Sequence, residues 1–537
     1  MKKYVYNVKG LLIIQVVFAT LSGLLQVLFP YLTLLLFDYD FSQGFEGILL
    51  IVGAYGVTIA VSVVSGYFCQ VFSWKLGRAF KISIRKDLFA VMSKISPIAF
   101  QSRSTGEYMS IISNDVSVIE EEFLESLTNL INSIISIMLY ATMLFVFIDY
   151  RIASVILLVS LITVFIPMIT GKRLAELRKA HLSALGRYTS LLQNLLNSHN
   201  LFNRKSVHTV GDKHRDLLVE VENKHLKSGV FKAFKNIINY LAMNILSISA
   251  FAAAAYLLYA GEITIGVGVA TLGYIESFID PIKYIVNDVN SINGTKEARQ
   301  EMNEFLNQPM PNYPTAEHFN HDIQFSGVCI SYENFTVKDF SFVFEKGKKY
   351  AIIGHSGSGK TSIVKAFLKQ VEISSGQIRI NGQDIAQIDI SSIVSWVSQD
   401  EHLFEAGLTD NITMFGAYEL TDTKRLEEIA SFEIWDTLST AENCQDLSGG
   451  EKQIVGLLRS LNMNTPVLVL DEPFSAVDVK TAKRINDYLL ALEDKTILMV
   501  THKISEDELT GFDVVLVMKN GCLVHSGSPN GVMDNMQ

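Results

Sequence analysis

The sequence predicts a multi-domain chain, in which an all-α, polytopic membrane domain with six transmembrane helices is followed by an α/β domain. Long apolar segments are confined to residues 1 to about 290, and beyond them short apolar strands alternate with helical segments. Between the two parts, residues 306–317 hold three prolines among polar neighbours, which is typical of a linker. We therefore expect the membrane domain over residues 1–305 and the α/β domain over residues 318–537.

The composition limits the class of protein. Of the 537 residues, 49% are hydrophobic and only 19% are charged, so the chain is more apolar than an average soluble protein. The net charge is −10 and no basic excess is present, which argues against a nucleic-acid partner. The four cysteines are scattered without a C-x-x-C pair, so we expect neither a disulfide framework nor a zinc site. Scattered thiols fit a reducing cytosol around the soluble part.

Six segments are long and apolar enough to cross a bilayer, because a helical span needs about 20 mostly apolar residues. They cover about residues 11–37, 45–72, 127–148, 152–169, 237–259 and 263–286. Lysines precede the first segment, as they precede the apolar core of a secretory signal. Its apolar part is longer than that core and no small-residue cleavage site follows it, so we expect a membrane span.

The basic residues set the orientation. Lysine and arginine concentrate in the two long connections, after the second and fourth spans, which places both connections and both termini in the cytoplasm. These connections contain few helix breakers, so we expect the spans to continue as helices below the membrane, by about 30 Å for every 20 residues. Turn-like breaks mark their tips, at about residues 97–115 and 197–212. An ordinary solvated loop is the alternative.

Three charged residues stand in the sixth span around Pro281, namely Glu276, Asp280 and Lys283. Each costs about 2.5–3.5 kcal/mol in mid-membrane, so none of them should face lipid. Spacings of four and three place them on one helical face. They would then line a water-accessible pathway for a polar or cationic substrate. An internal ion pair between Asp280 and Lys283 is an equally good interpretation.

In the α/β domain, Gly354–Thr361 fits G-x-x-x-x-G-K-[ST] and lies between an apolar strand and a helix. Glycines let the backbone N–H groups turn toward phosphate oxygens, and the helix N-terminus adds partial positive charge. Lys360 would reach the β- and γ-phosphates of a nucleotide, and Thr361 would bind Mg²⁺. A chance glycine turn is the alternative, and other segments of the chain are needed to distinguish it from a phosphate-binding loop.

Two further strands end in polar residues. The apolar run 467–470 ends in Asp471 and Glu472, and the run 496–500 is followed by His502. Ligands bind beyond the carboxyl ends of strands in open α/β sheets, so these residues should meet Thr361 at one edge. Asp471 would hold Mg²⁺, Glu472 would polarise an attacking water and His502 would contact the γ-phosphate. A solvated turn and a structural histidine are the alternatives.

One more glycine motif supports the nucleotide interpretation. In Leu447–Gln453, two glycines open what should be a helix, whose N-terminus is again a site for an anion. The γ-phosphate of one ATP is already held by the first loop. The presence of a second phosphate-binding helix end therefore suggests that this helix end acts in trans, on an ATP held by the glycine loop of a second molecule.

Five motifs occur along the chain in the order expected for ATP-binding cassette (ABC) transporters. The sequence resembles specifically the half-transporters of the exporter fold. The resemblance covers almost the whole chain and implies a P-loop NTPase domain with a helical subdomain. By it, the ATP-binding residues are Tyr332, Gly354, His355, Ser356, Gly357, Ser358, Gly359, Lys360, Thr361 and Ser362. The signature residues, which act on a partner's ATP, are Leu447, Ser448, Gly449, Gly450, Glu451 and Gln453.

The resemblance also assigns the remaining roles. The catalytic residues are Glu472, His502 and the Q-loop residue Gln399; the Mg²⁺ ligands are Thr361, Gln399 and Asp471; the D-loop residues are Ser475 and Asp478. For Tyr332, expected to stack on adenine, packing against a strand is the alternative. Residues 103–115 resemble the first coupling-helix region.

The same resemblance implies a transport cycle. Two nucleotide domains dimerise head to tail around two ATP molecules with Mg²⁺, and closure rocks the membrane halves. Because Glu472, His502 and the signature are intact, a homodimer is favoured over a heterodimer. The expected activity is ATP hydrolysis coupled to export of a peptide, drug-like or other polar or amphipathic solute across the cell membrane, in a bacterium the inner or plasma membrane. An importer of the same fold and an ATP-gated channel or regulatory protein are the alternatives.

Two features depart from the family pattern. The acidic-glycine element that usually precedes the signature is not recognisable around residues 441–443, and Ile454 stands where the family often has arginine. The first bears on communication between domains and not on ATP binding.

Overall fold

The computed structural model describes residues 1–308, 313–316, 318–332, 334–420, 423–430, 432–501 and 509–533. Within these ranges, some helical side chains are left out, including those of residues 160–172 and of Glu276. The chain divides into two compact units. The helical unit comprises Met1–Val91 and Thr105–Gln308, and the α/β unit comprises Met92–Ser104 and Pro309–Gln537.

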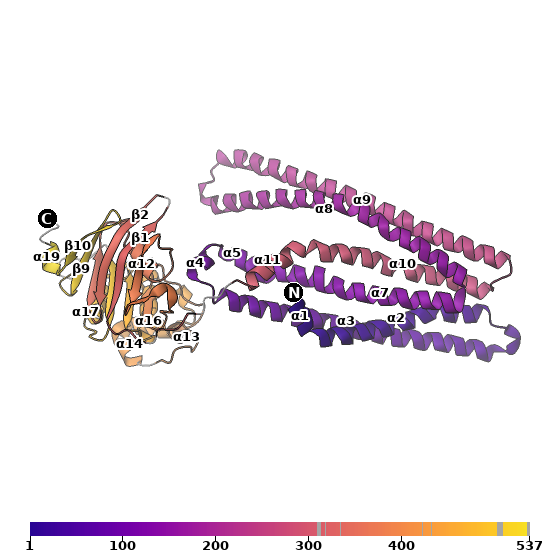
Figure 1. Ribbon diagram of the computed structural model, residues 1–537, viewed down its shortest axis with the longest axis horizontal. Helices are drawn as coiled ribbons and strands as arrows, with labels where there is room; N and C mark the ends of the chain where they lie inside the picture. The colour runs from indigo at the N-terminus through magenta and orange to yellow at the C-terminus, as the bar shows by residue number, and fades with distance from the viewer. Residues whose placement is uncertain are drawn as a thin grey trace. The chain divides into compact units, whose positions relative to one another are not determined.

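The helical unit is built from long helices joined by short turns (Figure 1). In chain order its elements are α1 (Lys2–Asn7), α2 (Lys9–Phe37), η1 (Phe41–Gln43), α3 (Phe45–Met92), α5 (Thr105–Ser110), η2 (Ile111–Asp115), α6 (Val116–Ile119), η3 (Glu120–Glu125), α7 (Ser126–Met143), η4 (Leu144–Ile148), α8 (Tyr150–Asn197), η5 (His199–Leu201), α9 (Ser206–Tyr259), α10 (Ile265–Gly294) and α11 (Lys296–Leu306).

Among the described residues, five helical stretches are long and apolar enough to cross a membrane. They are α2, α3, the continuous stretch Thr105–Ile148, α9 and α10. The fourth expected span lies in α8, whose described apolar part is Tyr150–Val159, and the side chains of residues 160–172 fall outside the description. The expected continuation of spans as helices is confirmed for α3, whose 48 residues form one helix of about 72 Å.

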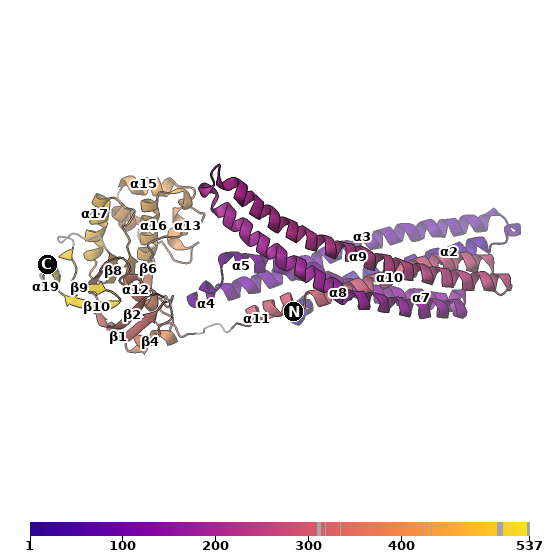
Figure 2. The same ribbon diagram turned by 90° about the horizontal axis from the view of Figure 1, so that it is seen from above.

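Two groups of helices pack within the unit. The helices α8 and α9 lie side by side along most of their length in both views (Figures 1 and 2). The helices α2, α7 and α10 form a second group. Here the hydroxyl of Tyr274 on α10 donates to the carbonyl of Val27 on α2 at 3.0 Å. A Cβ atom at Gly273 would lie 3.2 Å from Pro30, so the absence of a side chain lets α10 approach α2 closely.

The α/β unit contains two sheets. The larger sheet has the order β10-β9-β3-β8-β7-β6, is parallel from β9 to β6, and carries β10 antiparallel at its edge. The smaller, antiparallel sheet has the order β2-β1-β4-β5. This agrees with the expected parallel sheet with antiparallel additions. The bounds of the strands are β1 (Asp322–Ser331), β2 (Thr336–Glu345), β3 (Lys349–Ile353), β4 (Ser375–Ile380), β5 (Gln383–Asp384), β6 (Val394–Val397), β7 (Val467–Asp471), β8 (Thr496–Thr501), β9 (Val514–Lys519) and β10 (Cys522–Gly527).

The helices of this unit include the expected helical subdomain, α13 to α16, between β6 and β7. Their bounds are α4 (Pro97–Gln101), α12 (Lys360–Phe367), η6 (Ile385–Gln387), α13 (Leu408–Thr413), α14 (Thr423–Ala430), α15 (Phe432–Thr440), η7 (Cys444–Asp446), α16 (Gly449–Asn462), α17 (Val479–Leu490) and α19 (Pro529–Met533). The first helix after the glycine loop, α12, therefore begins at Lys360, and the signature helix α16 begins at Gly449.

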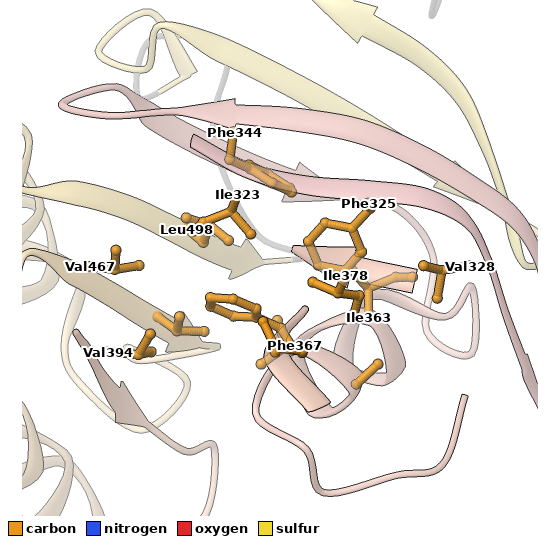
Figure 3. Packing of buried hydrophobic residues seen from close by; sticks show 14 of the residues in the cluster. Ile323, Phe325, Val328, Phe344, Ile363, Phe367, Ile378, Val394, Val467 and Leu498 are labelled. Atoms are coloured by element: carbon orange, nitrogen blue, oxygen red, sulfur yellow. The ribbon is translucent and has the colours of Figure 1, made fainter. Parts of the chain in front are cut away.

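One hydrophobic core joins both sheets through α12. Phe367, at the last turn of α12, is 1% exposed and points among side chains from both sheets (Figure 3). Its ring lies 6.1 Å from that of Phe325 on β1, and Leu498 on β8 belongs to the same cluster. Burying one face of α12 fixes the helix against the sheet, so the glycine loop before it is anchored at both ends.

We predict that Phe367→Ala destabilises the α/β unit by about 3–5 kcal/mol, because a buried ring is replaced by a cavity. In differential scanning calorimetry of the full chain, the transition of this unit should fall by roughly 10 °C. Val524→Ala is the control, since Val524 is 44% exposed and its truncation should leave the transition in place. Equal transitions for the two variants would contradict the assigned core.

Candidate functional site: the nucleotide pocket

The glycine loop connects β3 to α12 through backbone conformations that side chains do not allow. Gly354 has φ +153°, and a Cβ atom there would lie 2.3 Å from the carbonyl oxygen of Met518. Gly359 has φ +102°, and its Cβ atom would lie 2.9 Å from Val337. Both glycines are therefore required by the close approach of neighbouring chain segments.

Lys360, the first residue of α12, holds its ammonium group inside the loop. Its Nζ donates to the carbonyl oxygens of Gly354 at 2.8 Å and of His355 at 3.0 Å. Only 4% of the residue is exposed, and this burial lowers the pKa of the ammonium group. The Ser358 hydroxyl is buried without a hydrogen-bond partner. A phosphate would satisfy this hydroxyl and share the ammonium group with the two carbonyls.

The carboxyl end of β7 meets the loop, as expected. The Thr361 hydroxyl donates to Oδ1 of Asp471 at 3.1 Å, which brings together two of the three residues expected to bind Mg²⁺. Asp471 is 4% exposed, and burial, followed by the neighbouring Glu472, raises its pKa. A divalent cation would offset the cost of holding this carboxylate ionised. The donor set, a carboxylate and a hydroxyl beside a phosphate loop, fits Mg²⁺.

Glu472 and Gln399 also meet here. Nε2 of Gln399 donates to Oε2 of Glu472 at 3.1 Å, although the two residues are 73 positions apart. Glu472 has φ +51°, a left-handed conformation that costs a side-chain-bearing residue about 1–2 kcal/mol. Its N–H donates to Val500 at 2.9 Å, so pairing with β8 holds the strained backbone in place. Such strain at a candidate catalytic residue is typical of functional sites.

These groups surround a cavity of about 460 Å³. Its lining contains most of the glycine loop with Gln399 and Glu472, and the full set is Phe335, Ser356, Gly357, Ser358, Gly359, Lys360, Thr361, Ser362, Gln399 and Glu472. His502 lies outside the described residues. Tyr332 is 43% exposed and does not belong to the described lining, where Phe335 is the aromatic residue. The sequence analysis did not identify Phe335, which lies three positions after Tyr332.

The signature motif caps its own helix. Oε2 of Glu451 accepts hydrogen bonds from both the N–H and the hydroxyl of Ser448, at 2.8 and 2.6 Å. In return, the Glu451 N–H donates to the Ser448 hydroxyl oxygen, which completes a capping box. At Gly450, a Cβ atom would lie 2.5 Å from the carbonyl oxygen of Ala476. The motif therefore packs directly against the loop that follows β7.

The side chain of Gln453, predicted to act on a partner's nucleotide, makes its hydrogen bonds within its own domain. It is 4% exposed, and its Nε2 donates to the carbonyl of Gln399 at 3.1 Å and to the hydroxyl of Ser475 at 2.8 Å. Its Oε1 accepts from the N–H of Ala476 at 3.1 Å. One carboxamide thus joins the signature helix, the Q-loop and the D-loop. Asp478, the other D-loop residue, caps α17 by accepting from the Thr481 N–H at 3.0 Å.

A buried ion pair that the sequence analysis did not identify supports the Q-loop. Nη1 of Arg459 on α16 lies 3.0 Å from Oε1 of Glu401, and the side chains are 12% and 9% exposed. The other carboxylate oxygen of Glu401 accepts from the N–H and hydroxyl of Ser398, next to Gln399. Arg459 also donates to the carbonyl of Asn411 at 2.9 Å. The pair therefore positions the residue that contacts Glu472.

The charged residues of the sixth span lie in the helical unit, on α10. Nζ of Lys283 lies 3.0 Å from Oδ1 of Asp280, which is the internal ion pair held open as an alternative. The side chain of Glu276 lies outside the described residues. Asp280 also lines a cavity of that unit, so the pair does not exclude a position on a pathway.

Comparisons with known proteins agree with both halves of the chain. The sequence model of the ABC transporter transmembrane region matches residues 12–282, and that of the ABC transporter matches residues 337–475. The ATP-dependent lipid A-core flippase of Photobacterium profundum is 25% identical over 494 residues, covering 85% of this chain and 81% of the flippase. The fatty acid ABC transporter ATP-binding/permease protein of Mycobacterium tuberculosis is 23% identical over 511 residues, covering 88% of this chain and 78% of that protein. The structure of a bacterial Atm1-family ABC exporter with ATP bound superposes with a TM-score of 0.83 at 21% identity, covering 99% of this chain and 98% of the exporter.

We predict that Glu401→Gln destabilises the α/β unit by about 3–5 kcal/mol, because the Arg459 charge is left buried without its partner. ATP hydrolysis should fall as well, since Ser398 loses its charged acceptor beside Gln399. Calorimetry and ATPase rates of the full chain measure both effects. Adding Arg459→Met should restore part of the stability by removing the unpaired charge. The matched control is Glu493→Gln at an exposed position. If Glu401→Gln had the same unfolding transition and ATPase rate as this control, the positioning role of Glu401 would be refuted.

Proposed function

The chain belongs to the ABC transporter family, as an ATP-hydrolysing, multi-pass protein of the cell membrane, and from this premise we propose that it is one half of a homodimeric exporter. Two ATP molecules with Mg²⁺ bind between the nucleotide domains, and their binding and hydrolysis drive alternating access in the membrane domain. The exported substrate is a peptide-like, drug-like or other polar solute. The relatives named as a flippase and as a fatty acid transporter are built on the same plan, which supports transport of a solute through the helical unit.

One observation carries this proposal: the glycine loop, Asp471, Glu472 and Gln399 converge on a single cavity. Lys360 and the loop N–H groups would hold the β- and γ-phosphates, and Thr361 with Asp471 would hold Mg²⁺. Bound Mg²⁺ neutralises charge that develops on the phosphates. The Glu472 carboxylate, kept in place by Gln399, would accept the proton of the attacking water. A gating protein has no need of this base, which favours hydrolytic cycling over an ATP-gated channel.

The signature supports a dimer. The helix α16 begins at Gly449 beside the exposed Ser448, in a domain whose only described phosphate loop lies at the end of β3. Completing a site with that helix end requires a second copy, and a two-fold axis then yields two equal sites. The first cytoplasmic tip, at about residues 97–115, would transmit closure to the spans, as the resemblance of residues 103–115 to a coupling-helix region implies.

We predict that Glu472→Gln lowers ATP hydrolysis by at least about a hundredfold and leaves ATP binding intact, because the amide cannot accept the water's proton. Steady-state hydrolysis and binding of labelled ATP measure the two properties on the full chain in proteoliposomes. Substrate uptake into inside-out vesicles should be lost in parallel, and uptake in right-side-out vesicles would instead indicate an importer. Hydrolysis at the parent rate would overturn the assigned mechanism.

We predict that two inactive variants, Lys360→Ala and Ser448→Arg, complement each other when mixed as subunits. The first lacks the phosphate-binding lysine and the second has a blocked signature, so each homodimer has two defective sites. In the mixed dimer one of the two sites combines an intact loop with an intact signature. If subunits pair at random and the sites act independently, an equimolar mixture should show roughly a quarter of the parent activity, because about half of its dimers are mixed. The ATPase rate of the mixture measures this, and absence of any gain over the separate variants would argue against sites shared in trans.

A further inference from the structure

A polar cavity lies among α2, α7 and α10 in the helical unit, and its volume is about 700 Å³. Its lining carries hydroxyl, carboxamide and carboxylate groups at every position except one proline, and consists of Gln26, Asn129, Asn132, Ser133, Ser136, Tyr140, Ser277, Asp280, Pro281 and Tyr284. Ligand pockets in proteins are mostly apolar with a few polar groups, so this composition is the reverse of the usual one. In a membrane domain, such groups are expensive and need a reason.

The polar groups form continuous faces on two helices. On α7 they stand at positions 129, 132, 133, 136 and 140, and on α10 at positions 277, 280 and 284. Spacings of three, four and seven place residues on one side of a helix. Each helix therefore turns a polar face to the same cavity, while apolar residues of α7 and α10 pack in the neighbouring core that includes Tyr274 and Leu144.

The groups in this cavity retain hydrogen-bonding capacity. The Oδ1 atom of Asn132 is buried and has no hydrogen-bond partner. The amide of Gln26 makes only a long contact of 3.4 Å with Ser22, one turn earlier. Because Oδ1 has almost no accessible surface, a ligand could bond to it only after the carboxamide of Asn132 turns toward the cavity, which would recover a cost of about 1–3 kcal/mol.

The charge in the cavity is balanced. Asp280 is the only ionisable acid in the described lining, and Lys283 pairs with it at 3.0 Å. The lining thus offers many neutral donors and acceptors and no unbalanced charge, which disfavours both an acidic headgroup and a strongly cationic ligand.

We propose that this cavity binds a water-soluble solute whose surface is mostly amide and hydroxyl groups, such as a short uncharged peptide. The proposal rests on the proposed export function and names its substrate class. Carboxamide side chains both donate and accept, so they match peptide groups without requiring a charge. The volume lies within the range of about 300–1,000 Å³ that suits drug-sized ligands. A hydrocarbon chain of the same size would leave the polar faces unpaired, and sites built to hydrogen-bond reject such analogues strongly.

The test compares polar and apolar probes on the full chain in vesicles of phosphatidylethanolamine and phosphatidylglycerol. The polar probes are the capped tetrapeptide acetyl-Ser-Gly-Asn-Gly-amide and the trisaccharide raffinose. The probes dominated by hydrocarbon, called apolar here, are the anionic palmitate and the cationic rhodamine 6G. The readouts are equilibrium dialysis of the tritiated tetrapeptide and the ATPase rate with each probe, relative to the rate of the same variant without probe. We expect binding and stimulation by the tetrapeptide and none by palmitate.

Asn132→Leu should raise the concentration for half-maximal binding of the tetrapeptide by about tenfold or more, because an apolar side chain replaces a carboxamide of the lining. The matched control is Asn244→Leu on α9, where the exposed amide bonds only to the backbone of its own helix, at Tyr240. Binding equal in the two variants, or stimulation by apolar probes alone, would overturn the substrate class. Dialysis does not require ATP hydrolysis, so a chain that binds the tetrapeptide without hydrolysing ATP would refute the proposed function and leave the cavity assignment standing.

Discussion

A single buried carboxamide, that of Gln453, holds the nucleotide domain's working loops in register. It bonds to the backbone of the Q-loop, to Ser475 and to the N–H of Ala476, and it stands on the signature helix. Because a buried amide that loses one partner carries a large desolvation cost, these loops cannot shift independently. A shift of the signature helix would therefore also move the loops that surround Glu472.

The same rigidity explains how the site tolerates strain. Glu472 is held in a left-handed conformation directly after a strand that is buried along its whole length. Its N–H continues the pairing with β8, and its carboxylate receives the amide of Gln399. In turn, Glu401 is paired with Arg459 and accepts a hydrogen bond from the N–H of Ser398, which fixes the Q-loop next to Gln399. Each strained or charged group is thus held by a neighbour whose own position is fixed by burial, which is how preorganised sites are maintained.

The sequence predicted the parts of the site that are local. The glycine loop, the strand ending in Asp471 and the helix opened by the signature follow from short patterns, because turn chemistry and burial are encoded within a few residues. The partners of Gln453 and the Glu401–Arg459 pair could not be predicted, since they join residues separated by up to 58 positions and depend on packing. The polar face of α7 is also present as a spacing in the sequence. The apolar length of this span hides it, because one polar face does not prevent a helix from crossing a bilayer.

The capping box of α16 changes the chemistry of closing a site at that helix end. The two donors of Ser448 are already occupied by the carboxylate of Glu451. In the dimer that we propose, a phosphate that bonded to these donors would displace the Glu451 carboxylate, which stays tethered beside the site. A tetrahedral phosphate could bond to the N–H groups of several residues at once, whereas the tethered carboxylate reaches only its own cap. Geometry would then favour the phosphate over the carboxylate at this helix end.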